Sequence, residues 1–193
     1  MYIKREIRIL GIDDGYFDRN KDKYTIIVGV IMRGSLQIDG ILSNKIEIDG
    51  FDINDKIIEM IKRTKHYDEL RIIATNGISF GGFNLMDFEY LYNELNIPIV
   101  SFVRKKPNIN KFIEAVKHTK DYEKRLEILK KYPEPKSYKT EYGTLYFQYY
   151  GLEYDDVINI IKLTSVHSRI PEPIRVAHLI AMGITKGYSR GKP

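Results

Sequence analysis

The chain has 193 residues, of which 43% are hydrophobic and 30% are charged, a composition typical of one globular domain with a full core. Its net charge of +5 allows a polyanionic partner without requiring one. There is no cysteine, so disulfides, thiolate catalysis and cysteine-type zinc sites are excluded. No apolar run is long enough to cross a membrane, and residues 1–6 lack the apolar segment of a signal peptide. We therefore expect a cytoplasmic protein without a membrane partner.

The first predicted strand, residues 7–12, ends abruptly in Asp13, Asp14 and Gly15. Apart from Arg8 its side chains are apolar, which is typical of a strand buried on both faces. A carboxylate at the end of such a strand is held by rigid backbone, as Mg²⁺ ligands in proteins usually are. Asp and Gly are also common in plain turns, so an ordinary turn is the competing interpretation.

Two more strands follow, at residues 24–32 and, in two parts, at 36–42 and 45–48. Their short connections predict an antiparallel meander. A helix over 53–65 then leads to a strand over 70–75, and a strand–helix–strand step of this length favours parallel pairing.

The segment Asn76–Asn84 contains three glycines and two phenylalanines in nine residues. Glycine lets the backbone approach a ligand closely, and phenylalanine can stack on a base. A short hairpin turn is the alternative, although it does not account for the phenylalanines. The candidate nucleic-acid contacts in this segment are Gly77, Phe80, Gly81, Gly82, Phe83 and Asn84.

The second half of the chain continues the alternation of helices and strands. We predict helices over 85–95, 109–118, 121–131, 153–163 and 174–185, and strands over 96–103 and 144–150. The region of about 105–139 is rich in lysine and is predicted to be a helical segment of a single domain, residues 1–193. The predicted class is α/β, because three antiparallel strands followed by parallel strands and helices are the order of a ribonuclease H-like mixed sheet.

Acids at the ends of neighbouring strands of such a sheet converge on one cleft. Two-metal phosphodiester chemistry needs a cluster of this kind, since one ion activates water and the other stabilises the leaving oxygen. The side chains that the predicted topology gathers there are Asp13 or Asp14, Asp49 or Asp52, and Asn76.

Three segments resemble the archaeal endonuclease dU family, a distant relative of endonuclease V: Gly11–Gly15, Asn76–Asn84 and Pro171–Ala181. The similarity runs along essentially the whole chain in order. It implies a ribonuclease H-like fold, dependence on Mg²⁺ or Mn²⁺, and a DNA-repair endonuclease. The implied partner is uracil-containing DNA, nicked at deoxyuridine or another deaminated base.

The resemblance also suggests roles for individual residues. The catalytic candidates are Asp13, Asp49, Asn76 and His167, and the metal candidates are Asp13, Asp14, Asp49 and Asp52. His167 lies in a loop similar to the endonuclease V segment that holds a histidine of the catalytic site, whereas His178 is expected to be a core residue of the last helix. Phosphate contacts are expected from Lys105, Lys106, Arg169 and Arg175.

Asn76 departs from the family pattern, which usually has Asp before the glycine. An asparagine offers a carbonyl oxygen but no charge, so it should bind a hard cation more weakly. Either Asp13, Asp14 and Asp49 carry the metal site, or the protein is a weak or inactive nuclease. A third alternative is that the asparagine at position 76 is an introduced, inactivating substitution. The alternative function is a nucleic-acid-binding module without catalysis, and a nuclease acting on RNA is a third.

Overall fold

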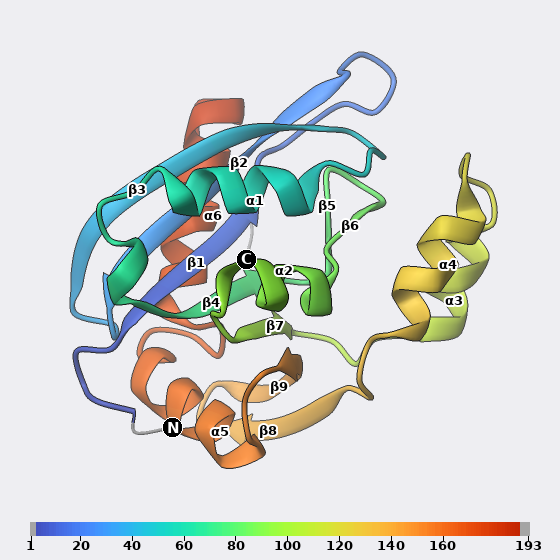
Figure 1. Ribbon diagram of the computed structural model, residues 1–193. Helices are drawn as coiled ribbons and strands as arrows, with labels where there is room; N and C mark the ends of the chain where they lie inside the picture. Colours follow the sequence, from blue (N-terminus) through green and yellow to red (C-terminus); the bar gives the residue numbers. More distant parts are fainter. Residues whose placement is uncertain (1–2, 190–193) are drawn as a thin grey trace.

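A seven-stranded mixed sheet with helices on both faces forms the body of the protein (Figure 1). The computed structural model describes residues 3–189. The strand order is β3-β2-β1-β4-β7-β9-β8, and β5 and β6 form a separate two-stranded hairpin. The strands are β1 (Arg8–Asp14), β2 (Tyr24–Arg33), β3 (Gln37–Glu47), β4 (Leu70–Asn76), β5 (Ser79–Phe80), β6 (Asn84–Leu85), β7 (Ile99–Val103), β8 (Lys136–Thr140) and β9 (Gly143–Tyr150).

The helices divide between the two faces of the sheet and an arm at its side (Figure 1). One face is covered by α1 (Ile53–Lys62) and α2 (Phe88–Leu95), and the other by α5 (Tyr154–Thr164) and α6 (Glu172–Lys186). The arm consists of α3 (Ile109–Val116) and α4 (Tyr122–Lys130), and a single 3-10 turn, Tyr67–Glu69, precedes β4. Within residues 3–189 no helix has the length and apolar character needed to span a bilayer.

The central strand β1 positions the polar residues at one edge of the sheet. It pairs antiparallel with β2 and parallel with β4, in a register that aligns Ile12 with Thr75. The carboxyl ends of β1 and β4 therefore place Asp13 and Asn76 next to each other. Gly11 allows α6 to approach this strand, because a Cβ here would collide with the backbone of Pro173.

The predicted fold class is confirmed, with differences in detail. The third strand is one continuous element, β3, whose register against β2 shifts between Ile31 and Met32. The segment 105–139 contains the two predicted helices but ends in a strand, because Lys136–Thr140 pairs antiparallel with β9. Tyr138 and Thr140 alternate with exposed lysines there, a pattern of an edge strand rather than a helix.

Candidate functional site

Asp13 is the centre of a buried polar cluster at the carboxyl edge of the sheet. Its carboxylate is only 2% exposed. The Asn76 Nδ2 lies 3.2 Å from each of its oxygens, and the His178 Nδ1 lies 2.8 Å from its Oδ2. Three segments far apart in the sequence, β1, β4 and α6, thus meet at one carboxylate.

His178 is a functional candidate that the sequence analysis assigned to the core. Its ring is largely buried on α6, and its Nε2 is a buried atom without a hydrogen-bond partner in the described part of the chain. When the neutral imidazole donates Nδ1–H to Asp13, Nε2 carries the lone pair and can accept a proton. The histidine is therefore oriented by a carboxylate and leaves its second nitrogen for chemistry. His167 instead lies exposed on the loop before α6.

The Asp14 side chain points away from this cluster, because successive side chains of a strand point to opposite faces. The backbone N–H of Gly81 donates to its Oδ2 at 2.6 Å. Burial, followed by the nearby negative charge of Asp13, raises the pKa of Asp14 to about 7. Asp14 therefore keeps its proton to a higher pH than an ordinary aspartate.

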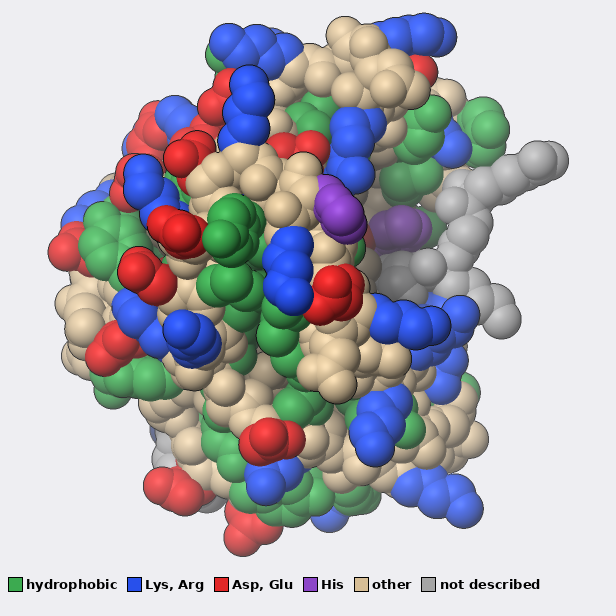
Figure 2. All heavy atoms as spheres, turned by 90° about the vertical axis from the view of Figure 1, so that its right-hand side faces the viewer, with side chains coloured by type: hydrophobic (Ala, Val, Ile, Leu, Met, Phe, Trp, Pro, Cys, Tyr) green, Lys and Arg blue, Asp and Glu red, His purple; other side chains and the backbone are tan. Residues whose placement is uncertain are grey.

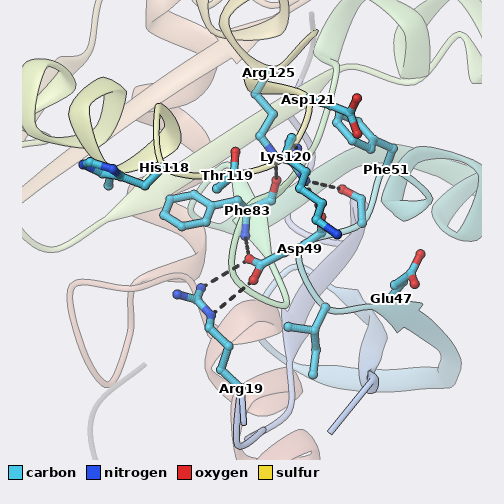
Figure 3. Close-up of a pocket in the computed structure, with 13 residues that line it drawn as sticks. Arg19, Glu47, Asp49, Phe51, Phe83, His118, Thr119, Lys120, Asp121 and Arg125 are labelled. Carbon is cyan, nitrogen blue, oxygen red and sulfur yellow. Dashed lines mark hydrogen bonds and ion pairs between the residues drawn. The ribbon is translucent and has the colours of Figure 1, made fainter. Parts of the chain in front are cut away.

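Asp49 lies in the turn after β3, in a left-handed conformation with φ of 56°. Its carboxylate accepts a hydrogen bond from the Phe83 N–H at 2.8 Å and forms an ion pair with Arg19 at 3.3 Å (Figure 3). Its own N–H donates to the Gly81 carbonyl at 2.8 Å. Gly82 must be glycine, since a Cβ there would collide with the Asp49 carboxylate. Asp49 is thus fastened to residues 81–83, the glycine loop, rather than to Asp13.

Asp52 and Asn84 form a hydrogen-bonded unit at the start of α1. The Asn84 Nδ2 donates to the Asp52 Oδ1 at 2.6 Å and to the Glu47 carbonyl at 3.0 Å. The Asn84 Oδ1 accepts from the Ile53 N–H at 3.1 Å. These contacts join the end of β3 to α1 and occupy both side chains.

The two phenylalanines of the Asn76–Asn84 segment have different environments. Phe80 is fully buried in the core between the sheet and α1, so its ring is not presented at the surface. Phe83 is half-buried, packs edge-on against Phe112 at 5.7 Å, and lies 5.2 Å from the Arg19 guanidinium. The segment forms a small hairpin, β5–β6, and Gly77, which precedes the hairpin, has a left-handed φ of 80°.

The predicted basic contacts also differ in availability. Lys105 and Lys106 are exposed on the linker from β7 to the arm. Arg169 is half-buried and donates to the Thr144 carbonyl at 3.1 Å. Arg175 forms two hydrogen bonds with the buried carboxylate of Glu172, at 2.6 and 2.8 Å, so its charge is neutralised within α6.

Arg104 is a second candidate that sequence reasoning missed. It follows β7, whose end lies beside that of β4. Its Nε is buried without a hydrogen-bond partner in residues 3–189. Burial, followed by the positive charge of Arg169, lowers the pKa of Arg104. Two adjacent guanidinium groups, one with a free buried donor, form an arrangement that an anion would stabilise.

The residues around Asp13 fit a single hard cation with few protein ligands. Among the described residues no three His, Cys, Asp or Glu side chains are grouped so that they could hold a metal ion. Mg²⁺ commonly uses one or two side-chain oxygens and completes its shell with waters and substrate phosphate. Asp13 supplies carboxylate oxygens, and rotation of the Asn76 amide would replace its Nδ2 by an oxygen. A site with one carboxylate is expected to bind weakly.

Comparison with known proteins identifies relatives of the chain in sequence and in fold. The chain is 42% identical over 189 residues to a UPF0215 protein of Methanopyrus kandleri, covering 97% of this chain and 95% of that protein. A crystal structure of a protein of unknown function from Archaeoglobus fulgidus superposes with a TM-score of 0.82 at 35% identity, over 92% of this chain and 97% of the other. Ciona intestinalis endonuclease V, in complex with DNA containing an inosine, superposes with a TM-score of 0.57 at 15% identity, over 88% and 82% of the two chains.

The fold is therefore that of endonuclease V, a mixed sheet flanked by helices. The family model described as endonuclease dU matches residues 5–185. The chain belongs to the endonuclease dU family. Its family and its fold together support a nuclease-like role.

Proposed function

We propose that the protein is a metal-dependent endonuclease that nicks DNA at deoxyuridine or another deaminated base. The observation that carries this proposal is the Asp13 cluster, in which a buried carboxylate orients a histidine whose Nε2 has no partner in residues 3–189. Membership in the endonuclease dU family supports the reaction, and the DNA-bound endonuclease V of the same fold supports the partner.

His178 and Asp13 would move a proton during phosphodiester hydrolysis. With Nδ1–H bonded to Asp13, the His178 Nε2 can take a proton from an attacking water or, once protonated, return one to the leaving oxygen. Asp13 stabilises the imidazolium through the 2.8 Å contact. A bound Mg²⁺ ion, held by Asp13 and the Asn76 amide oxygen, would neutralise charge on the phosphate.

Arg104 and Arg169 would hold a phosphate of the DNA strand. Arg104 brings a buried donor without a partner in the described structure, and Arg169 adds a second positive charge. Phosphate contacts of this kind position a strand without reading its sequence. Lys105 and Lys106, exposed on the same linker, extend the basic surface along the strand, and Lys and Arg side chains are spread over the arm-bearing face (Figure 2).

A non-catalytic nucleic-acid-binding module is the second candidate function, and Asn76 is the observation that favours it. The Asn76 amide already satisfies both oxygens of Asp13, so the cluster is stable without a cation. A protein that binds uracil-containing DNA equally well with and without chelator, and never cleaves it, would have this function.

The test is a nicking assay with purified protein, Mg²⁺ and a duplex that contains one deoxyuridine. We expect the wild type to nick this duplex and not the matched deoxycytidine duplex, and Asp13→Ala to abolish the activity. Equal trace activity in the two proteins would refute the assignment. Replacing the cleaved strand by its ribose counterpart separates DNA from RNA cleavage.

A further inference from the structure

A cavity of about 870 Å³ lies between the helical arm and the turn that carries Asp49 (Figure 3). Its walls come from the α3–α4 connection, from the turn after β3 and from the glycine loop. This volume is in the range of sites that hold small organic ligands. Figure 3 shows Thr119, Lys120 and Asp121 of the arm on one side and Asp49 with Arg19 on the other.

Arg125 fastens the arm to both loops and fixes the cavity. It is 2% exposed, although it is an arginine on the exposed helical arm. It donates to the carbonyls of Phe83 at 2.9 Å and Lys120 at 2.6 Å, and also to the Asp49 carbonyl. Because the three donor nitrogens of its guanidinium bind backbone of the walls, Arg125 shapes the cavity and has little capacity left for an anionic ligand.

Phe51 provides an aromatic surface at this cavity. Its ring is 40% exposed, and the Arg125 guanidinium lies 4.1 Å from the ring centroid. The Arg125 guanidinium is itself immobilised by its carbonyl partners, and the Lys124 ammonium lies 5.9 Å from the same ring centroid. The exposed part of the Phe51 ring is left for a ligand. An exposed phenylalanine held in this way is suited to stack on a flat ring.

The charges that line the cavity largely cancel. Arg19 is paired with Asp49, and Arg125 is bound to carbonyl groups, while the other charged lining residues are Lys120, Glu47 and Asp121. This lining favours an uncharged planar ligand over a phosphate. The Arg104–Arg169 pair, by contrast, is positively charged and is suited to a phosphate.

The cavity is coupled to the Asp13 edge through the glycine loop. The Gly81 N–H binds the Asp14 carboxylate, the Gly81 carbonyl binds the Asp49 N–H, and Asp49 in turn binds the Phe83 N–H. The glycine loop therefore lies between the strand ends and the cavity, with the proposed reaction site on one side and the Phe51 ring on the other.

We infer that this cavity receives an uncharged nucleobase extruded from the DNA strand, stacked on Phe51, and that the helical arm forms the wall that selects it. The inference rests on the proposed function and adds the place where the base is recognised. Extrusion costs the stacking of the base in the duplex, and stacking on an aromatic side chain recovers part of it. Uracil and other deaminated bases are uncharged planar rings, as the lining requires.

The experiment measures binding in EDTA, without cleavage, by fluorescence anisotropy of duplexes with one deoxyuridine or one deoxycytidine. Phe51→Ala removes the stacking ring, and Ala115→Trp fills the cavity from an exposed position of α3. The matched controls are Tyr122→Ala, an arm tyrosine also 40% exposed, and Glu114→Trp, the residue next to Ala115; neither lines the cavity. We expect the first two variants to lose roughly tenfold in preference for deoxyuridine, and the controls to keep it.

Wild-type preference in both Phe51→Ala and Ala115→Trp would overturn the inference, while nicking by the wild type would leave the proposed function standing. A wild type that neither prefers nor nicks the deoxyuridine duplex would overturn the proposed function and this inference together. Thermal unfolding of each variant identifies any loss of fold. The inference is supported only if Phe51→Ala, which removes volume, and Ala115→Trp, which adds it, both lose the preference for deoxyuridine.

Discussion

The Asn76 Nδ2 lies 3.2 Å from both carboxylate oxygens of Asp13 and so occupies the position where a cation would neutralise them. An amide donor satisfies a buried carboxylate at low cost, whereas a second carboxylate would repel it. The residue at position 76 therefore decides how strongly the cluster needs a metal ion.

Asn76→Asp should strengthen the metal site that we propose at Asp13. Two adjacent carboxylates repel each other until a divalent cation is bound, so we expect the variant to have a lower Tm than wild type in EDTA and a larger rise in Tm on addition of Mn²⁺. Nicking of the deoxyuridine duplex should increase by about tenfold or more. Identical Mn²⁺ responses in the two proteins would contradict a metal at Asp13.

His178→Ala should lower the rate of nicking by roughly 10² to 10⁴, the usual contribution of a general acid–base. DNA binding in EDTA should be unchanged. His178→Gln tests whether hydrogen bonding to Asp13 suffices, and we expect it to restore stability but not activity. His167→Ala is the control on the exposed loop, and loss of activity in that variant alone would assign the chemistry to His167.

Arg104→Ala should weaken binding to deoxyuridine and undamaged DNA by the same factor, because a phosphate contact carries no base preference. The slope of log affinity against log salt should fall by about one. The substitution removes a partly buried charge next to Arg169, so Tm should not decrease. Lys117→Ala, an exposed arm position, serves as the control. A lower Tm with an unchanged salt slope would indicate a structural arginine instead.

The raised pKa of Asp14 predicts that stability falls as pH rises. The unfolded chain releases this proton near the ordinary value of an aspartate, whereas the folded protein keeps it up to about pH 7. Between the ordinary pKa of 3.8 and about pH 7, the folded state therefore binds more protons than the unfolded state. Ionisation of Asp14 above this range destabilises the folded state. Asp14→Asn keeps an oxygen for the Gly81 N–H and has no proton to lose.

Urea unfolding in EDTA at pH 5 and pH 8 measures this effect. The free energy of unfolding of Asp14→Asn relative to wild type should increase by roughly 2 to 3 kcal/mol between the two pH values. A constant difference would mean that Asp14 is ionised throughout in the folded protein.

Much of the fold was predictable because local patterns and connection lengths carry it. The β-branched runs of β1, β2 and β4 and the step through α1 determine pairing directions almost by themselves. β8 was missed because an exposed lysine-rich edge strand buries little, and its alternation is weak.

The site was predictable in part. The meeting of Asp13 with Asn76 follows from parallel strand ends, but the partners of Asp49 and Asp52 depend on loop geometry that periodicity does not encode. A signal for His178 was present, however. Gly11 and Asp13 are two residues apart on a strand, and Ile174 and His178 are four apart on a helix, so both spacings are roughly 6 to 7 Å. A helix packed on Gly11 through Ile174 therefore brings His178 to Asp13.

We propose that Asp13 lies at the reaction centre. A crystal of the wild-type protein soaked in Mn²⁺ tests it directly, because anomalous scattering locates the ion. We expect an ion bound by the Asp13 carboxylate, with the Asn76 amide turned to present its oxygen. Mn²⁺ bound at Asp49 and absent from Asp13, in a protein that nicks deoxyuridine DNA, would contradict it.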